Sequence, residues 1–119
     1  MLLASDAYSY RSGVLYCEEA PLDEIARRAG TPCYVYSSRA VLDRFRAYEE
    51  ALEGFPHLVS YAVKANSNLA LLRLLAAAGA GFDIVSGGEL FRVIQAGGDP
   101  SRVVFSGVGK TPAEIEYAL

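Results

Sequence analysis

The sequence of 119 residues contains few of the side chains that bind metal ions or form disulfide frameworks. It has two cysteines, Cys17 and Cys33, and a single histidine, His57. A structural zinc site needs about four such ligands, and a disulfide framework needs several spaced cysteines. We therefore expect two reduced thiols and no metal site. His57 directly precedes a predicted strand and is interpreted as a solvated turn residue.

Long apolar runs and blocks of basic residues are also missing. The most apolar stretch, residues 69–82, is interrupted by Arg73 and two glycines and is shorter than the ~18 residues that a membrane-spanning helix requires. Residues 1–12 lack the basic and then apolar pattern of a signal peptide. Eleven Lys and Arg against fourteen Asp and Glu give a net charge of -3, which disfavours nucleic acid and anionic membranes as partners. We predict a cytoplasmic protein.

What the sequence does contain is a regular alternation of two patterns. With 52% hydrophobic residues the chain can bury one core, so we expect at most one domain and exclude two. Runs typical of strands alternate with stretches typical of helices and begin about 21 to 25 residues apart. This alternation predicts a parallel sheet with right-handed crossovers, either open and doubly wound or a (β/α)8 barrel. The strands are expected at 33–36, 58–63, 81–85 and 102–105, and the helices at 38–53, 68–78, 89–96 and from 112 onward.

Residues 1–30 do not follow this repeat. Residues 8–10 and 14–17 flank a turn and predict a β-hairpin, and residues 21–29 predict a helix. An isolated hairpin is marginally stable in water, so we expect it to pair with a sheet that this sequence does not contain. Residues 31–119, with about four βα units, would then be half of a barrel that normally takes ~250 residues. We therefore interpret the chain as the N-terminal part of a longer protein.

Capping patterns support the expected helices. Thr111, Pro112 and Glu114 form the pattern of a capping box with proline at the first helical position. Ser86 and Glu89 have the same spacing, and this cap would explain both residues without any ligand. Four glycines stand where a helix end favours a left-handed residue: Gly30, Gly54, Gly79 and Gly97.

Lys64 is the first candidate for chemistry. Alternation along the expected strand places Ser60, Ala62 and Lys64 on one face, with the lysine at the carboxyl end, where barrel enzymes carry their catalytic groups. The chain has nine arginines but only two lysines, Lys64 and Lys110. A partly desolvated amine has a lowered pKa and can attack a carbonyl, which a guanidinium cannot do. The alternative is a structural lysine whose amine extends into solvent.

Asp83 is the second candidate. Phe82 and Ile84 are expected to face helices, which leaves Asp83 on the face of the sheet that carries Lys64. A carboxylate there would hold the lysine or orient a cationic ligand. The alternatives are a turn or a salt bridge that serves the structure alone.

A nucleotide site is disfavoured by spacing. Residues 107–111 end in Gly-Lys-Thr, as a Walker A loop does, but Val104 stands where that motif requires its first glycine. No Gly-x-Gly-x-x-Gly fingerprint is present in the sequence.

Taken together, four successive motifs resemble the pyridoxal-phosphate-dependent diaminopimelate decarboxylases, which share an alanine-racemase-like barrel. The motifs are Thr-Pro-Cys-Tyr-Val-Tyr at 31–36, Tyr-Ala-Val-Lys-Ala-Asn at 61–66, Gly-Phe-Asp-Ile-Val-Ser-Gly-Gly-Glu-Leu at 81–90, and Val-Phe-Ser-Gly-Val-Gly-Lys-Thr at 104–111. They follow one another in the order and at the spacing of that family. The resemblance covers nearly the whole chain, and it implies a second β-domain to which the hairpin and helix of residues 1–30 contribute.

This resemblance implies a cofactor and a site. Lys64 would be the catalytic lysine that carries pyridoxal 5'-phosphate covalently, and Ala62 and Asp83 would line the cofactor pocket with Ser86 and Glu89 at its edge. The family decarboxylates meso-diaminopimelate to L-lysine, a small-molecule amino-acid substrate, and works as a homodimer. The resemblance also implies that the residues that bind the phosphate and clamp the substrate lie beyond residue 119. We therefore expect the 119 residues alone to be inactive.

Other functions of the same fold remain open at this point. Ornithine or arginine decarboxylases share the barrel, and so do alanine racemases, although residues 67–70 lack the aromatic-Gly-His-Gly run that follows the lysine in racemases. A non-catalytic pyridoxal-phosphate-binding barrel protein is a further alternative. A half-barrel that self-associates to cover its open edge is the last.

Overall fold

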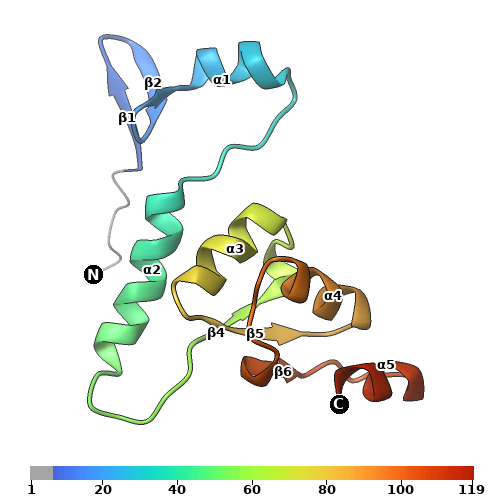
Figure 1. Cartoon of the computed structure of the whole chain (residues 1–119). Helices are drawn as coiled ribbons and strands as arrows, with labels where there is room; N and C mark the ends of the chain where they lie inside the picture. Colours follow the sequence, from blue (N-terminus) through green and yellow to red (C-terminus); the bar gives the residue numbers. More distant parts are fainter. Residues whose placement is uncertain (1–6) are drawn as a thin grey trace. The chain divides into compact units, whose positions relative to one another are not determined.

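The chain folds into two compact units in a computed structural model that describes residues 7–119 (Figure 1). The first unit ends at Asp43 and the second runs from Arg44 to Leu119. Residues 1–6 lie outside the described residues. They include the start of the expected N-terminal segment 1–30 and part of the stretch on which the signal-peptide prediction rests. Within residues 7–119, no helix is long and apolar enough to cross a lipid bilayer.

The first unit is a small antiparallel sheet followed by a helix. Strands β1 (Tyr8–Arg11) and β2 (Val14–Cys17) form the predicted hairpin, and the short strand β3 (Ala20–Pro21) adds to β2. The hairpin turn has positive φ at Ser12 and Gly13, the two-residue geometry that matches the twist of paired strands. Helix α1 (Leu22–Ala29) follows within one residue of the predicted bounds.

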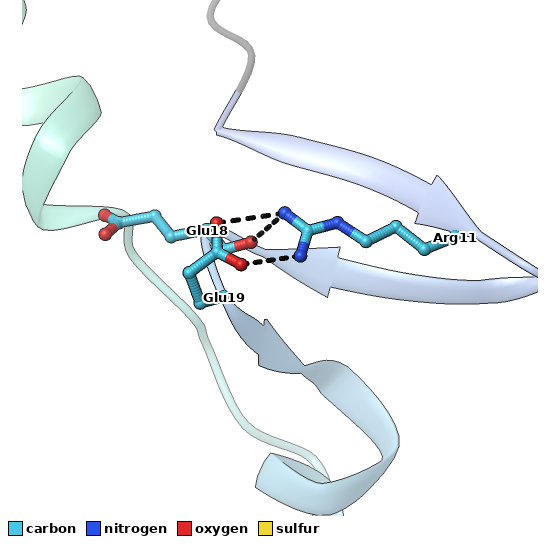
Figure 2. A network of polar contacts seen from close by, with 3 residues as sticks. All are labelled: Arg11, Glu18 and Glu19. Carbon is cyan, nitrogen blue, oxygen red and sulfur yellow. Dashed lines mark hydrogen bonds and ion pairs between the residues drawn. The ribbon is translucent and has the colours of Figure 1, made fainter.

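Arg11 joins the hairpin to the segment before β3. Its guanidinium forms a bidentate ion pair with Glu19, with nitrogen to oxygen distances of 2.6 and 3.1 Å, and donates to the Glu18 carbonyl at 2.9 Å (Figure 2). It also lies 4.7 Å above the centre of the Tyr16 ring. The fork geometry of arginine makes such a pair possible where lysine could form only one bond. The hydrogen bonds from Arg11, followed by its charge, lower the pKa of the Glu19 carboxyl.

The side chain of Glu18 points away from Arg11, as Figure 2 shows, and reaches the start of helix α2 (Ser38–Ala51). One carboxylate oxygen accepts bonds from the Ser37 hydroxyl at 2.7 Å and the Arg39 amide at 2.9 Å. The first amides of a helix lack partners within the helix, so a carboxylate stabilises them. The hydrogen bond from the Arg39 amide, followed by the one from the Ser37 hydroxyl, lowers the pKa of the Glu18 carboxyl.

The second unit contains a parallel sheet of three strands. Its order is β4 (Ser60–Ala62), β5 (Gly81–Ile84) and β6 (Val103–Phe105), with helix α3 (Leu69–Ala77) between the first pair and helix α4 (Gly87–Gln95) between the second. A final helix, α5 (Pro112–Ala118), follows β6. The expected α/β order with a parallel sheet is confirmed.

Most of the buried hydrophobic residues belong to this second unit. Phe82 and Ile84, on one face of the central strand, have no exposed surface, and the same is true of Val63, Leu72 and Val93. On the opposite face of the neighbouring strand β6, the side chain of Val104 is 51% exposed. The sheet therefore has one face covered by helices and one open face. Phe82 and Ile84 lie on the helix side, as the alternation predicted.

Gly81 allows the strands to approach closely. A β-carbon at this position would lie 2.7 Å from the Arg102 carbonyl oxygen and 2.8 Å from the Ser60 hydroxyl oxygen. Glycine is the residue that removes such a clash. Gly81 pairs with Ser60 in the β4 to β5 register, so its small size supports the alignment of the two strands.

Two expectations about strands are wrong. Residues 33–36 form no strand, because no neighbouring strand pairs with them; the Val35 carbonyl instead accepts a bond from the Tyr8 hydroxyl at 2.8 Å. The strand expected at 58–63 is limited to Ser60–Ala62 and turns into a short 3-10 helix, η1 (Val63–Ala65). Three of the four expected strands are therefore present, the last one preceded by a 3-10 turn, η2 (Pro100–Arg102).

The helix ends agree with the capping patterns. Thr111 and Glu114 form the complete capping box, and Pro112 is the first residue of α5. Four glycines at the ends of helices or of the turn after α2 have positive φ as expected: Gly30, Gly54, Gly79 and Gly97. At Ser86 only half of the expected box forms. Its hydroxyl accepts from the Glu89 amide, but the Glu89 carboxylate bonds to the Val85 amide, one residue earlier than a capping box requires.

Candidate active site

Lys64 lies in the 3-10 turn η1, directly after the ladder of β4 has ended. The prediction that it continues the alternation of the strand is wrong, because the backbone leaves the extended conformation at Val63. The side chain of Val63 is fully buried and anchors the turn in the core, whereas Lys64 is exposed. The core thus holds the backbone on one side of Lys64 and leaves its amine free to reach a ligand.

Asp83 lies in the central strand, in register with Ala62. Registered residues of parallel strands share a face, so Asp83 and Ala62 lie on the open face of the sheet, as predicted, and the turn that carries Lys64 begins one residue after Ala62. The Oδ1 atom of Asp83 is buried, and no described residue donates a hydrogen bond to it. A buried oxygen without a partner costs about 1–3 kcal/mol, which indicates that this side chain is kept for a ligand or a group outside the described residues.

The N-terminus of α4 forms a neighbouring edge. Ser86 caps the helix by accepting from the Glu89 amide at 3.2 Å, and Glu89 Oε2 accepts from the Val85 amide at 2.7 Å. Structural bonds therefore account for one oxygen of each residue. The edge role that the resemblance implies for Ser86 and Glu89 stays a prediction.

Glu114 on α5 contributes to the same edge, and the sequence did not indicate this. Its Oε1 atom accepts from the Gly87 amide at 3.0 Å, while Oε2 closes the capping box of α5 with the Thr111 amide at 2.9 Å. The Gly87 bond, followed by the Thr111 bonds, lowers the pKa of the Glu114 carboxyl. The Thr-x-x-Glu pattern indicated the cap, but nothing in the sequence indicated the second bond.

The loop after Lys64 is held by side chains. The Tyr61 hydroxyl donates to the Asn66 carbonyl at 3.1 Å, and Asn66 Oδ1 accepts from the Asn68 amide at 3.0 Å. Arg92 on α4 donates to the Ser67 carbonyl at 3.1 Å. Asn68 then caps α3.

These residues suit a carbonyl-containing cofactor better than a metal ion. Within residues 7–119, no three His, Cys, Asp or Glu side chains are grouped as metal ligands would be. A primary amine at Lys64 can form a covalent bond with an aldehyde, and the unpartnered oxygen of Asp83 can accept a bond from a cationic group. The residues present therefore fit pyridoxal phosphate as far as its covalent attachment is concerned.

Comparisons with known proteins agree with this chemistry. The family model described as "Pyridoxal-dependent decarboxylase, pyridoxal binding domain" matches residues 38–119. Diaminopimelate decarboxylases from Pseudomonas aeruginosa and Vibrio cholerae are 59% and 57% identical, each over 96% of this chain and 28% of the relative. The chain thus spans about 28% of the length of these relatives.

Solved structures show the same relationship. A crystal structure of a protein from Aquifex aeolicus superimposes with a TM-score of 0.90 at 48% identity, over 96% of this chain and 28% of that one. The diaminopimelate decarboxylase of M. jannaschii gives a TM-score of 0.88 at 35% identity with the same coverage. The resemblance seen in the four motifs is confirmed, and so is pyridoxal as the cofactor type of the matching family. The chain belongs to the family of pyridoxal-dependent decarboxylases, through their pyridoxal-binding domain.

Proposed function

We propose that this chain is the cofactor-binding part of a diaminopimelate decarboxylase, in which Lys64 holds pyridoxal phosphate and Asp83 lies beside it. One observation carries the assignment: Asp83 presents a buried oxygen without a described partner on the open face of the sheet, in register with the residue two positions before Lys64. Lys64 is also one of only two lysines in the chain. The other, Lys110, donates to the Gly107 carbonyl at 2.6 Å and lies over the Phe105 ring.

The proposed role of each residue is supported by its position. Lys64 supplies the amine, and the buried side chain of Val63 fixes the backbone next to it. Asp83 accepts a hydrogen bond from a cationic group, and the small side chain of Ala62 leaves room beside it. Ser86 and Glu89 form the edge of the pocket. When bound, the cofactor supplies an electron sink for the electrons left behind when a carboxylate departs as carbon dioxide.

The proposal extends to the longer protein. Its substrate would be meso-diaminopimelate and its product L-lysine, and it would be a cytoplasmic homodimer. Residues 31–119 would be the first half of a (β/α)8 barrel, and residues 1–30 would belong to a second β-domain. A crystal structure of the Helicobacter pylori diaminopimelate decarboxylase is complexed with L-lysine, and the two chains are 46% identical over 82% of this chain and 25% of that one.

Ornithine or arginine decarboxylation is the second candidate. The lysine/ornithine decarboxylase of Vibrio vulnificus and the arginine decarboxylase of a Chlorella virus superimpose with TM-scores of 0.74 and 0.64. Their identities of 25% and 30% are lower than the 35% to 59% found for the diaminopimelate decarboxylases above. This difference favours diaminopimelate. A racemase or a non-catalytic barrel protein has no specific observation in its favour.

The experiment that tests the cofactor role is reductive trapping. The chain is incubated with pyridoxal phosphate, reduced with borohydride and mapped by peptide mass spectrometry. We expect the adduct mainly at Lys64, its loss in Lys64→Ala, and an unchanged pattern in the matched control Lys110→Ala. Equal labelling of Lys64, Lys110 and the amino terminus would contradict the proposal.

A chimera tests the catalytic role. This chain replaces the matching segment of the Pseudomonas aeruginosa enzyme, and release of carbon dioxide from meso-diaminopimelate is measured. We expect decarboxylation by the chimera and none by its Lys64→Ala variant, while the isolated 119 residues stay inactive. A folded chimera that binds pyridoxal phosphate but releases no carbon dioxide would instead favour the non-catalytic alternative.

A further inference from the structure

The position of Lys64 outside the sheet raises the question of what orients it. A residue within a strand takes its direction from the hydrogen-bonded ladder and the pleat. Lys64 lies in the three-residue turn η1, where no ladder acts on it. Upstream, the register of β4 and the burial of Val63 hold the backbone. Downstream, the backbone depends on the loop of residues 66–68.

Two of the contacts that hold this loop come from nearby in the sequence. Tyr61 reaches forward from β4 to the Asn66 carbonyl, and the Asn66 side chain accepts from the Asn68 amide. Both contacts shape the loop, but neither connects it to another helix. They leave the loop able to shift together with the end of β4 and the start of α3.

The third contact is of a different kind. Arg92 lies on the exposed surface of α4, 25 residues away in the sequence, and its Nη1 atom donates to the Ser67 carbonyl at 3.1 Å. A charged donor makes a stronger hydrogen bond than a neutral one. Helix α4 is itself fixed in the core through Leu90 and Val93. Arg92 thus connects the loop after Lys64 to a helix whose place is set by the core.

The same helix carries the other edge of the site. Its N-terminus holds Ser86 and Glu89, while Arg92 lies in its last turn. One helix therefore carries Ser86 and Glu89, which are proposed above as the edge of the site, and contacts through Arg92 the loop that follows the lysine.

We propose that Arg92 is a positioning residue that fixes the turn carrying Lys64 through the Ser67 carbonyl, so that the amine is directed to the open face of the sheet near Asp83. This proposal rests on the function proposed above. Arg92 acts through the backbone and is not itself in contact with the reacting groups.

The test compares three variants of the chain. Arg92→Met removes the donor and keeps much of the apolar stem. Arg92→Lys retains one charged donor, and its extra amine is distinguished because each adduct is mapped to its own peptide. The matched control is Arg73→Met, because Arg73 is exposed on α3 and lies outside the loop contacts described here.

Two readouts are measured for each variant. The first is the ratio of Lys64 to Lys110 labelling, with pyridoxal phosphate and borohydride and, separately, with acetic anhydride. The second is the protection of the Asn68 amide against hydrogen exchange. In Arg92→Met we expect both to fall by roughly two- to tenfold, the range that loss of one hydrogen bond supports. Arg92→Lys and Arg73→Met should stay within about twofold of the unmodified chain by the same measure.

The outcomes separate the two proposals. If protection falls but the labelling ratio does not, Arg92 has only a structural role and the positioning proposal is overturned. An equal effect of Arg73→Met overturns it as well. If pyridoxal phosphate shows no preference for Lys64 in the unmodified chain, the proposed cofactor role fails, and Arg92 is then judged by the acetic anhydride ratio together with Asn68 protection.

Discussion

Replacing Gly81 by alanine tests whether the close approach of the strands sets the geometry of the site. The new methyl group would lie 2.7 Å from the Arg102 carbonyl oxygen and 2.8 Å from the Ser60 hydroxyl oxygen. The first of these atoms belongs to the backbone of the neighbouring segment and cannot rotate away. Both distances are far below ordinary van der Waals contact, so the strands must separate or the backbone must shift.

The expected cost is that of overpacking a core, about 1–3 kcal/mol of unfolding free energy. With a urea dependence of about 2 kcal/mol per molar, a loss of about 2 kcal/mol lowers the unfolding midpoint by about 1 M. The midpoint is followed by circular dichroism at 222 nm, and an unchanged slope shows that stability has changed and not the extent of unfolding.

Gly109 provides the matched control. A β-carbon there would meet no atom within 4 Å, and its φ is not in the positive range. Gly109→Ala should therefore stay within about 0.5 kcal/mol of the unmodified chain. If Gly81→Ala were equally neutral, the close approach would not constrain the sheet and the reasoning from this contact would be refuted.

Two further predictions concern helix starts. Because the pKa of Glu114 is lowered in the folded chain, its bond to Gly87 stabilises the fold fully above the ordinary glutamate pKa of about 4.3, and this stabilisation is lost as the pH falls through the lowered pKa. The protection factor of the Gly87 amide against hydrogen exchange should therefore fall on acidification in the unmodified chain and be independent of pH in Glu114→Gln. A protection factor that is independent of pH in both chains would refute the link. The Asn68 side chain caps α3 by accepting a hydrogen bond from the Ala70 amide at 2.9 Å. Asn68→Ala removes this cap and should lower the unfolding free energy by about 1 kcal/mol, measured by urea titration. An unchanged unfolding midpoint would show that the cap contributes nothing to stability.

The fold could be predicted where a local pattern and its partner lie in the same segment. The capping box of Thr111 and Glu114, the hairpin turn at Ser12 and Gly13, and the alternation in Gly81–Ile84 all depend on neighbours a few residues apart. Residues 33–36 show the limit of such patterns. Their β-branched and aromatic composition favours a strand, but a strand forms only when another strand pairs with it, and no described strand does so.

The residues of the candidate site could be proposed from the sequence, but the local structure that carries them could not. Lys64 and Asp83 could be chosen from their types and places along the chain, and the shared face of Ala62 and Asp83 followed from period-two alternation. The turn at Val63 could not be foreseen, because burial of a valine in the core overrides the continuation of the strand pattern. The contacts of Arg92 and Glu114 join residues 25 and 27 positions apart, and a sequence pattern carries no information about such pairs.

The unpartnered oxygen of Asp83 has a consequence for how this chain could be improved. Replacing Asp83 by a well-packed apolar residue would relieve a desolvation penalty and make the empty chain more stable, at the expense of the group that distinguishes the open face of the sheet. Selection or design for thermal resistance alone would therefore tend to remove this carboxylate. If Asp83 has the role proposed above, its presence marks a trade-off in which the chain gives up stability in order to keep a hydrogen-bond acceptor for the ligand.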